Sequence, residues 1–269
     1  MALPFREIMS SPTFRFEVGT SSFEVHRAAI TKESPVLDKL MNGSMEEARQ
    51  GVARLEDVSE ETFVRFTQFA YTGDYVPPSF QIAAGAEELE KSNPYASDDD
   101  PWKLIQSKGK KKSHSFDRFD EGEAQRLFKN VEYELPRSRT ALLAACEARP
   151  NRGSDEDYTP VFLGHAELYV FADQYGIKDL KTLVLHKLHR LLVVFSAYES
   201  RVTDIVALVR YTYTNTPFCD NIADQFREMV LLYVASQFKK IGRSQDFVDL
   251  VAEGGSFAAD LILKLQENM

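Results

Sequence analysis

Cysteine is scarce in this 269-residue chain, which has two, Cys146 and Cys219. Two cysteines are too few for a disulfide framework, and their neighbours offer no metal-ligand spacing. Long apolar runs are also missing: no stretch approaches the roughly 18 apolar residues of a membrane span. Residues 1–12 lack the apolar segment of a signal peptide. We therefore expect an intracellular protein, in the cytoplasm, the nucleus or both, with no membrane association.

Positive charge is not in excess, since the formal net charge is −9. Binding to phosphate backbones requires a concentrated basic surface, so nucleic acid is not expected as a partner. The chain also lacks a phosphate-binding loop, a Gly-Xaa-Ser-Xaa-Gly elbow and a metal-ligand constellation. We predict no catalysis, no cofactor and no small-molecule substrate, and we expect the partners to be proteins.

The N-terminal part contains alternating and helical patterns. TFRFEV (13–18) alternates apolar and polar residues, which predicts a half-buried strand, and FEV (23–25) completes a hairpin. A short helix follows from Ala28. Ser34-Pro35 is typical of a helix start, because serine caps orphan amides and proline fits the first helical position. Gly43 is expected to end this second helix in a left-handed conformation.

A brief strand and a longer helix complete this part. VARL (52–55) is predicted to be a strand. Ser59 is expected to cap a helix that buries its phenylalanines, and Gly73 is expected to end it. The region then changes: polar, charged and Pro/Gly-punctuated stretches dominate up to residue 160. Such segments bury too little apolar area to offset chain entropy, so we predict a largely disordered insertion over 78–160. Short helices are expected within it, over 119–135 and 139–148.

KGKKK (108–112) within this insertion has two interpretations. A basic cluster can act as a nuclear import signal. A charge run inside a polar segment can equally be a solvated stretch without function. The sequence leaves both open.

Helical periodicity resumes near Val161. A helix is predicted over 165–175, ending at Gly176-Ile177 in a Schellman motif, in which glycine turns the chain and isoleucine packs back. The next predicted helix buries Leu180, Leu183, Val184, Leu188, Leu191 and Leu192. Four further helices are expected near 202–213, 222–239, 245–253 and 256–266. Hairpin, helices, one short strand and more helices indicate an α+β fold with a small sheet.

These elements, in this order, resemble the BTB/POZ domain in the form common among fungal proteins. The matching residues are Val25-His26-Arg27, Ser34-Pro35-Val36, Leu55-Glu56-Asp57-Val58, Phe63 and Tyr71-Thr72-Gly73, together with AELYVFADQYGIKDLKTLVLHKL (166–188). The resemblance implies a BTB/POZ fold interrupted by the insertion and followed by an all-helical extension. The expected division is a tail (1–12), the first part of the core (13–77), the insertion (78–160), the closing helices (161–195) and the extension (196–269).

The resemblance also implies partners. In BTB proteins that recruit cullin ubiquitin-ligase scaffolds, an apolar residue, any residue and a glutamate follow the second helix; Met45-Glu46-Glu47 fits this pattern. Met45 and Glu47 are therefore the predicted partner-binding residues of a substrate adaptor. The other interpretation is that Met45 packs against its own domain. BTB domains also dimerise through their first helices, which implies self-association through Ile30, Val36, Leu37 and Leu40 in a scaffold or nuclear regulatory protein without a ligase role.

The histidines are interpreted as structural. His26 lies at a strand–helix junction without a nearby acid or nucleophile, so it is expected to fix the entry of the helix rather than to catalyse. His186 and His189 lie three residues apart on one helix, but zinc needs at least one more ligand. His165 and Glu167 are the only nearby candidates in the sequence. We expect a pair of partly exposed histidines and no metal.

Overall fold

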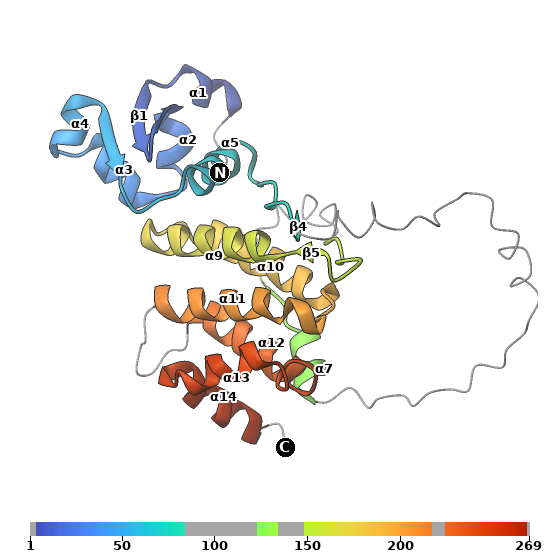
Figure 1. Cartoon of the computed structure of the whole chain (residues 1–269). Helices are drawn as coiled ribbons and strands as arrows, with labels where there is room; N and C mark the ends of the chain where they lie inside the picture. Colours follow the sequence, from blue (N-terminus) through green and yellow to red (C-terminus); the bar gives the residue numbers. More distant parts are fainter. Residues whose placement is uncertain (1–3, 84–122, 134–147, 217–223, 268–269) are drawn as a thin grey trace, which may run out of the picture.

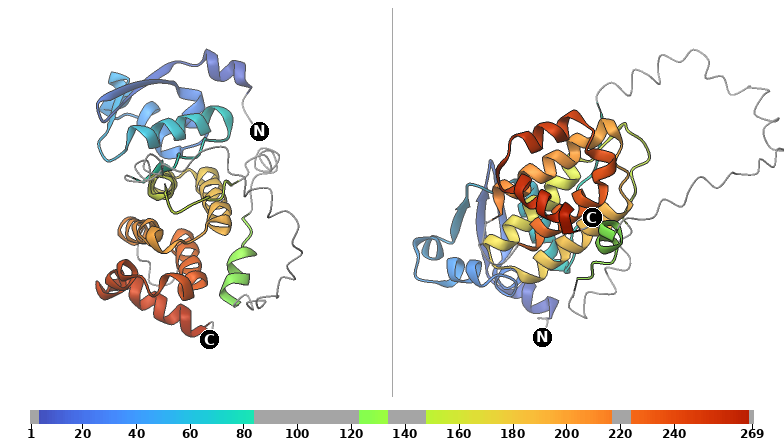
Figure 2. Two further views of the ribbon diagram at one scale, coloured as in Figure 1. Left: turned by 45° about the vertical axis from the view of Figure 1, so that its right-hand side comes forward. Right: turned by 90° about the horizontal axis from the view of Figure 1, so that it is seen from below.

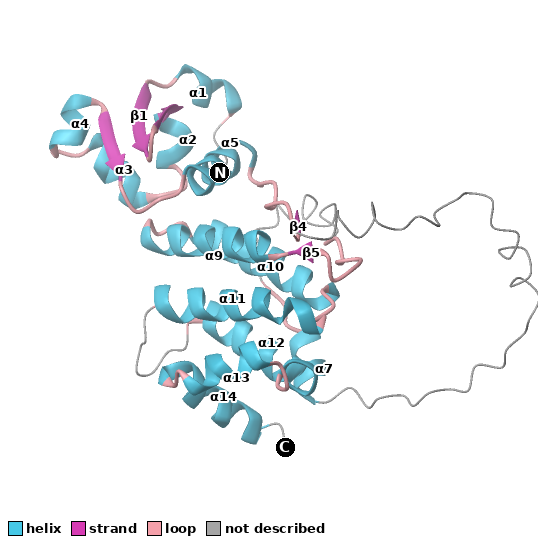
Figure 3. Ribbon diagram, in the orientation of Figure 1, coloured by secondary structure: helices cyan, strands magenta, loops and turns pink. Residues whose placement is uncertain are grey.

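A small three-stranded sheet lies in the N-terminal part of the molecule, where the sequence alternates apolar and polar residues. The computed structural model describes residues 4–83, 123–133, 148–216 and 224–267. β1 (Thr13–Val18) pairs antiparallel with β2 (Ser21–His26) and parallel with β3 (Val52–Leu55), which gives the order β2-β1-β3. Figure 3 shows these strands in magenta among the helices. The predicted hairpin and the predicted third strand are thus confirmed.

The two faces of the sheet differ in polarity, as the period of two requires. Phe14, Phe16 and Val18 are buried on the inner face. The outer face carries two exposed cross-strand ion pairs, in which Arg15 binds Glu24 and Arg54 binds Glu17. Such exposed pairs contribute little stability, on the order of 0–1 kcal/mol each. The inner face therefore provides the stabilising contacts.

Short helices join the strands and cover the sheet. They are α2 (Arg27–Thr31), α3 (Pro35–Asn42), α4 (Glu46–Gln50) and α5 (Glu60–Thr72). Ser34 caps α3 by accepting a hydrogen bond from the Leu37 amide at 3.0 Å, and Ser59 caps α5 in the same way from Thr62. Gly73 ends α5 with a φ of +83°, in the left-handed region. These caps and this helix end agree with the prediction.

Gly43 differs from the expectation, because it is extended (φ −78°, ψ −163°) and not left-handed. A Cβ atom at this position would lie 2.3 Å from the Lys39 carbonyl oxygen. Glycine is therefore needed here for space, not for a positive φ. The chain that leaves α3 passes tightly over its last turn and enters α4, a helix that the sequence did not predict.

Two helical layers follow the sheet and α5. α9 (Thr159–Gln174) and α10 (Lys178–Val194) lie between the N-terminal sheet with α5 and the C-terminal helices (Figures 1 and 2). The C-terminal layer contains η2 (Glu199–Arg201), α11 (Val202–Asn215), α12 (Gln225–Ile241), α13 (Gln245–Ala252) and α14 (Gly255–Glu267). Among the described residues, no helix combines the length and apolarity that crossing a membrane would need.

Aromatic side chains join the N-terminal sheet to the helical layers. Phe16 packs on Phe63 of α5 with ring centroids 5.2 Å apart, and Phe63 packs on Phe66 at 6.0 Å. Phe66 in turn lies 4.9 Å from Phe171 of α9. Most of the buried apolar residues of both parts belong to one cluster. Gly176 ends α9 with a φ of +68°, and the amide of Ile177 donates to the Ala172 carbonyl at 2.8 Å, so the predicted Schellman motif is confirmed.

The predicted tail and the predicted insertion both contain regular secondary structure. Within residues 1–12, α1 (Phe5–Ser10) forms a short helix that buries Ile8. Within 78–160, the described elements are β4 (Gln81–Ile82), α7 (Glu123–Lys129) and β5 (Glu156–Asp157); β4 pairs with β5, and α7 packs on α12. KGKKK (108–112) and the expected helix over 139–148, except its last residue, lie outside the described residues.

Candidate interaction surface

The α3 helix is fixed to the closing helices at its first residue. The Ser34 hydroxyl accepts from the Leu37 amide and donates to the Tyr175 carbonyl oxygen at 2.6 Å. Leu37 and Met41 are fully buried beneath the helix. Ser34 itself is inaccessible to solvent. The end of α9 therefore sets the position of α3, and with it the start of the segment that leads to Met45.

Met45 lies where the chain turns into α4. It occupies the N-cap position of this helix, and 52% of its surface is exposed. About half of the residue's surface is therefore left uncovered by its own domain, and binding of a partner at Met45 stays a prediction. The thioether side chain is flexible and polarisable, and it adapts to shallow apolar hollows. Met45 is thus placed as an apolar side chain available to a partner.

Glu46 and Glu47 form the first turn of α4, directly after Met45. Glu46 is exposed and accepts a hydrogen bond from Gln50 at 2.7 Å, whereas Glu47 is partly buried. Carboxylates are favoured at this end of a helix by the partial positive charge of its free amides. The arrangement combines an exposed apolar side chain with adjacent negative charge. A partner that fits it would carry an apolar hollow beside basic side chains.

The four residues predicted for self-association are placed differently from one another. Ile30 and Leu37 are fully buried in the chain's own core, so they cannot contact a second copy without unfolding. Val36 is 45% exposed, and Leu40 is partly buried against the core. Of these four residues, only Val36 and Leu40 reach the surface of the molecule.

An apolar face that the sequence did not indicate lies on α1. Phe5 is 62% exposed and Met9 is 49% exposed, on a helix that contacts α2 and β2. Phe5, Ile8 and Met9 follow the i, i+3, i+4 spacing of an amphipathic helix. That spacing could have predicted the helix, but six residues are too short for periodicity to be distinctive. We name Phe5, Met9 and Val36 the N-terminal apolar residues.

His26 has a structural role of a different kind from the one expected. Its backbone amide donates to the Tyr71 hydroxyl at 2.9 Å, and its Nδ1 atom lies 2.8 Å from the same oxygen. The partner is therefore the side chain of α5, not a neighbouring backbone group. His26 is the N-cap residue of α2, and Tyr71 belongs to α5. The contact between them therefore fixes how α5 packs at the junction between β2 and α2.

The other histidines in the described part of the chain contact different neighbours. His189 is buried, which corrects the expectation of partial exposure, and its Nε2 donates to the Phe128 carbonyl oxygen at 2.6 Å. His186 is partly buried. His165 contacts Tyr75, while Glu167 accepts from Ser59 and Thr62. Within the residues that the structure describes, no group of three or more His, Cys, Asp or Glu side chains could hold a metal ion.

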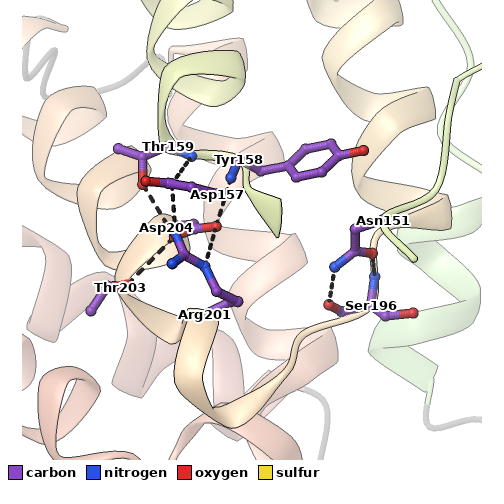
Figure 4. Close-up of polar contacts among 8 residues, drawn as sticks. All are labelled: Asn151, Asp157, Tyr158, Thr159, Ser196, Arg201, Thr203 and Asp204. Atoms are coloured by element: carbon purple, nitrogen blue, oxygen red, sulfur yellow. Dashed lines mark hydrogen bonds and ion pairs between the residues drawn. The ribbon is translucent and has the colours of Figure 1, made fainter. Parts of the chain in front are cut away.

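A buried polar network holds the segment before α9 against α11 (Figure 4). Asp204 is inaccessible to solvent and accepts hydrogen bonds from the Tyr158 amide at 2.9 Å and the Thr159 hydroxyl at 3.1 Å. Arg201 binds Asp204 and Asp157, each at 2.5 Å. We name these three charged residues with Tyr158 and Thr159 the Asp204 network. It fixes the start of α9 and therefore the position of the middle helical layer.

A second polar contact fixes the same segment. The Asn151 side chain donates to the Ser196 carbonyl oxygen at 2.8 Å and accepts from the Ser196 amide at 2.7 Å (Figure 4). The Asn151 amide thus binds both the N–H and the C=O group of Ser196, as the backbone of a paired strand residue would. The described residues 148–158 are thereby attached to the end of α10 and to the start of α11.

Comparison with known proteins identifies the N-terminal part. A family model for the BTB/POZ domain matches residues 6–91. No curated protein matches the chain significantly. The matched range contains the three-stranded sheet, α2 to α5 and the Met45 segment.

Proposed function

Because residues 6–91 form a BTB/POZ domain, a protein–protein interaction module, we propose that this chain is a substrate adaptor for a cullin-type ubiquitin ligase. The observation that carries the proposal is the position of Met45, exposed at the start of α4 with Glu47 in the adjoining helical turn. In this account the cullin scaffold docks on α3 and α4. That the domain has the particular form common among fungal proteins stays a prediction.

In this proposal each part of the chain binds another protein or holds the binding parts together, and none catalyses a reaction. Residues 13–77 and 161–195 form the docking core, which 78–160 interrupts. The C-terminal extension, 196–269, or the insertion holds the substrate. The Phe66–Phe171 contact supports this arrangement because it joins the two parts of the docking core, and the Asp204 network supports it because it attaches the start of α9 to the extension through buried groups. A substrate held on the extension would then keep a fixed position relative to the cullin.

We expect Met45→Asp to weaken cullin binding at least about 30-fold, which corresponds to the roughly 2 kcal/mol of an interface hot spot. The physical reason is that a carboxylate would have to lose its hydration to enter an apolar hollow. Titration calorimetry of the chain against a cullin N-terminal domain from the same organism measures the effect. Wild type should bind with micromolar affinity or tighter.

The matched control for this substitution is Val248→Asp, which introduces the same charge at an exposed apolar residue of α13. It should leave cullin binding within about twofold of wild type, since it lies outside the proposed interface. Equal weakening by both variants would point to net charge rather than to Met45. Folded wild type that does not bind would refute the adaptor function.

The second candidate function is a self-associating scaffold without a ligase role. The N-terminal apolar residues Phe5, Met9 and Val36 favour it, because three large apolar side chains are exposed near the first helices. Light scattering should then show a dimer in wild type and a monomer in the Phe5→Glu, Met9→Glu double variant. A wild type that stays monomeric at high concentration would exclude this function.

A further inference from the structure

A cavity of about 250 Å³ lies between the segment after α5 and the middle helical layer. Its walls are mostly apolar and include Pro78, Phe80, Tyr158, Val161 and Leu191. Cavities that hold drug-sized ligands are typically about 300–1,000 Å³. This one is smaller and matches one large side chain better than a whole cofactor.

The walls of the cavity are held rigidly. Pro78 packs on Gly164 of α9, where a Cβ atom would lie 2.4 Å from the proline Cγ, so glycine allows the close approach. Phe80 stacks on Tyr158 with ring centroids 5.6 Å apart and planes 9° apart. The Asp204 network fixes the backbone of Tyr158, as Figure 4 shows. The cavity is therefore preformed and does not depend on rearrangement of these side chains.

A buried imidazole lines the cavity. His165 is 1% exposed, and its Nδ1 lies 2.8 Å from the Tyr75 hydroxyl. Among the described residues, its ring makes no other hydrogen bond. Burial, with nearby Lys187 and Arg65, lowers the pKa of His165 to about 3, so the ring is neutral at physiological pH. A neutral ring nitrogen that lacks a partner at an apolar cavity is available to a polar atom of a ligand.

A second hollow of about 370 Å³ adjoins the first along α10. It is lined by residues that include Val131, Tyr133 and Val193, and it shares His186 and Arg190 with the first cavity. The shared residues belong to one turn of α10, so the two hollows lie on either side of one ridge. An extended chain could therefore occupy both. We name the two hollows with this ridge the α10 groove.

The charge of the α10 groove is opposite to that of the chain. Its lining includes four cationic residues and one carboxylate, Glu132, in a chain of net charge −9. The cations are Lys129, Arg149, Lys187 and Arg190. Arg149 and Lys187 are paired with Glu156 and Asp74. Arg190 is exposed and has no ion pair within the described part of the chain.

We propose that the α10 groove binds a short acidic peptide of a partner protein. One bulky apolar side chain of the peptide fills the 250 Å³ cavity, and its carboxylates contact Arg190 and His186 on the ridge. The size of the cavity favours a side chain, the adjoining hollow favours an extended chain, and the unpaired guanidinium favours an acidic one. The site is separate from the Met45 segment, so it does not depend on cullin binding.

The test uses the full chain and a fluorescein-labelled pentapeptide, Glu-Glu-Trp-Glu-Glu, in a fluorescence anisotropy titration without any cullin. Wild type should bind it with micromolar affinity. Replacing the tryptophan by alanine, or all four glutamates by lysine, should weaken binding at least tenfold. Arg190→Glu should weaken binding of the original peptide at least tenfold, and Ala148→Trp should do the same by filling the cavity from its rim.

The control is Arg243→Glu, which makes the same charge change at an exposed arginine outside the groove. It should bind the peptide within about twofold of wild type, and circular dichroism should show all variants folded. A second titration uses 2-naphthoate, a small aromatic carboxylate. Binding of naphthoate without binding of the peptide would overturn the peptide as occupant. Binding of neither, or equal weakening by both arginine variants, would overturn the site.

Discussion

Replacing Asp204 by alanine is expected to lower the free energy of unfolding by about 3–5 kcal/mol, the loss typical when one partner of a buried ion pair is removed. Asp204 is inaccessible to solvent, and Arg201 is largely buried beside it. Without the carboxylate, the Tyr158 amide and the Thr159 hydroxyl also lose their acceptor. Unfolding in urea, followed by circular dichroism, measures the loss.

The control for this substitution is Glu199→Ala in the same junction. Glu199 is exposed in the short 3-10 helix before α11, and its side chain makes no hydrogen bond or ion pair within the described part of the chain. Exposed positions of this kind usually change stability by less than about 0.5 kcal/mol. If Asp204→Ala had as little effect as Glu199→Ala, the Asp204 network would not hold α9 in place.

The second large effect is expected from Phe66→Ala, at about 3–5 kcal/mol, as found for buried aromatic truncations. Phe66 is inaccessible and contacts Phe63 on its own helix and Phe171 on α9. Its removal leaves a cavity between the BTB/POZ sheet and the middle helical layer. Because this contact joins the two parts, the wild-type chain should unfold in one transition by calorimetry.

Val64→Ala is the matched control, on the same helix but at a residue that is 43% exposed. It should cost much less, since little apolar area is lost. Two resolved thermal transitions in wild type would contradict the account, because the BTB/POZ sheet and the helical layers would then be independent units. In that case the extension would not hold a substrate in a fixed position relative to the cullin.

Local patterns were sufficient to predict most of the N-terminal part. Thr13–Val18 alternates strictly, and its three apolar residues are indeed the buried ones. Ser34-Pro35 predicted the start of α3, because a cap acts on amides within one turn and needs no knowledge of the rest of the fold. The stripe from Leu180 to Leu192 is buried throughout. In these segments, neighbouring residues alone decide the conformation.

Contacts between distant residues could not be predicted. Asp204 resembles an ordinary acidic residue in a first helical turn, and its partners Tyr158 and Thr159 lie more than 40 positions earlier, at the end of the segment 78–160 that was predicted to be largely disordered. His189 was expected to be partly exposed, and it is buried because α7, which comes from the predicted insertion, covers it. Each error followed from a partner that the local sequence does not reveal.

The candidate surface was predicted in part. Met45 and Glu47 were identified from a three-residue resemblance, and Met45 is exposed, but α4 and the exposed side chains of Phe5 and Met9 were not foreseen. Burial of Ile30 and Leu37 likewise depends on which side of α2 and α3 faces the sheet. The α10 groove is lined by four separate chain segments, so it could not be predicted from local patterns.

The most direct test of the adaptor function is amide hydrogen exchange of the chain, measured with and without the cullin N-terminal domain. α4 is short and buries no side chain, so its amides should exchange quickly in the free protein. The account predicts that binding slows exchange over residues 45–51 and leaves α13 unchanged. Slowed exchange along α10 with none at 45–51, or no change anywhere at saturating cullin, would contradict it.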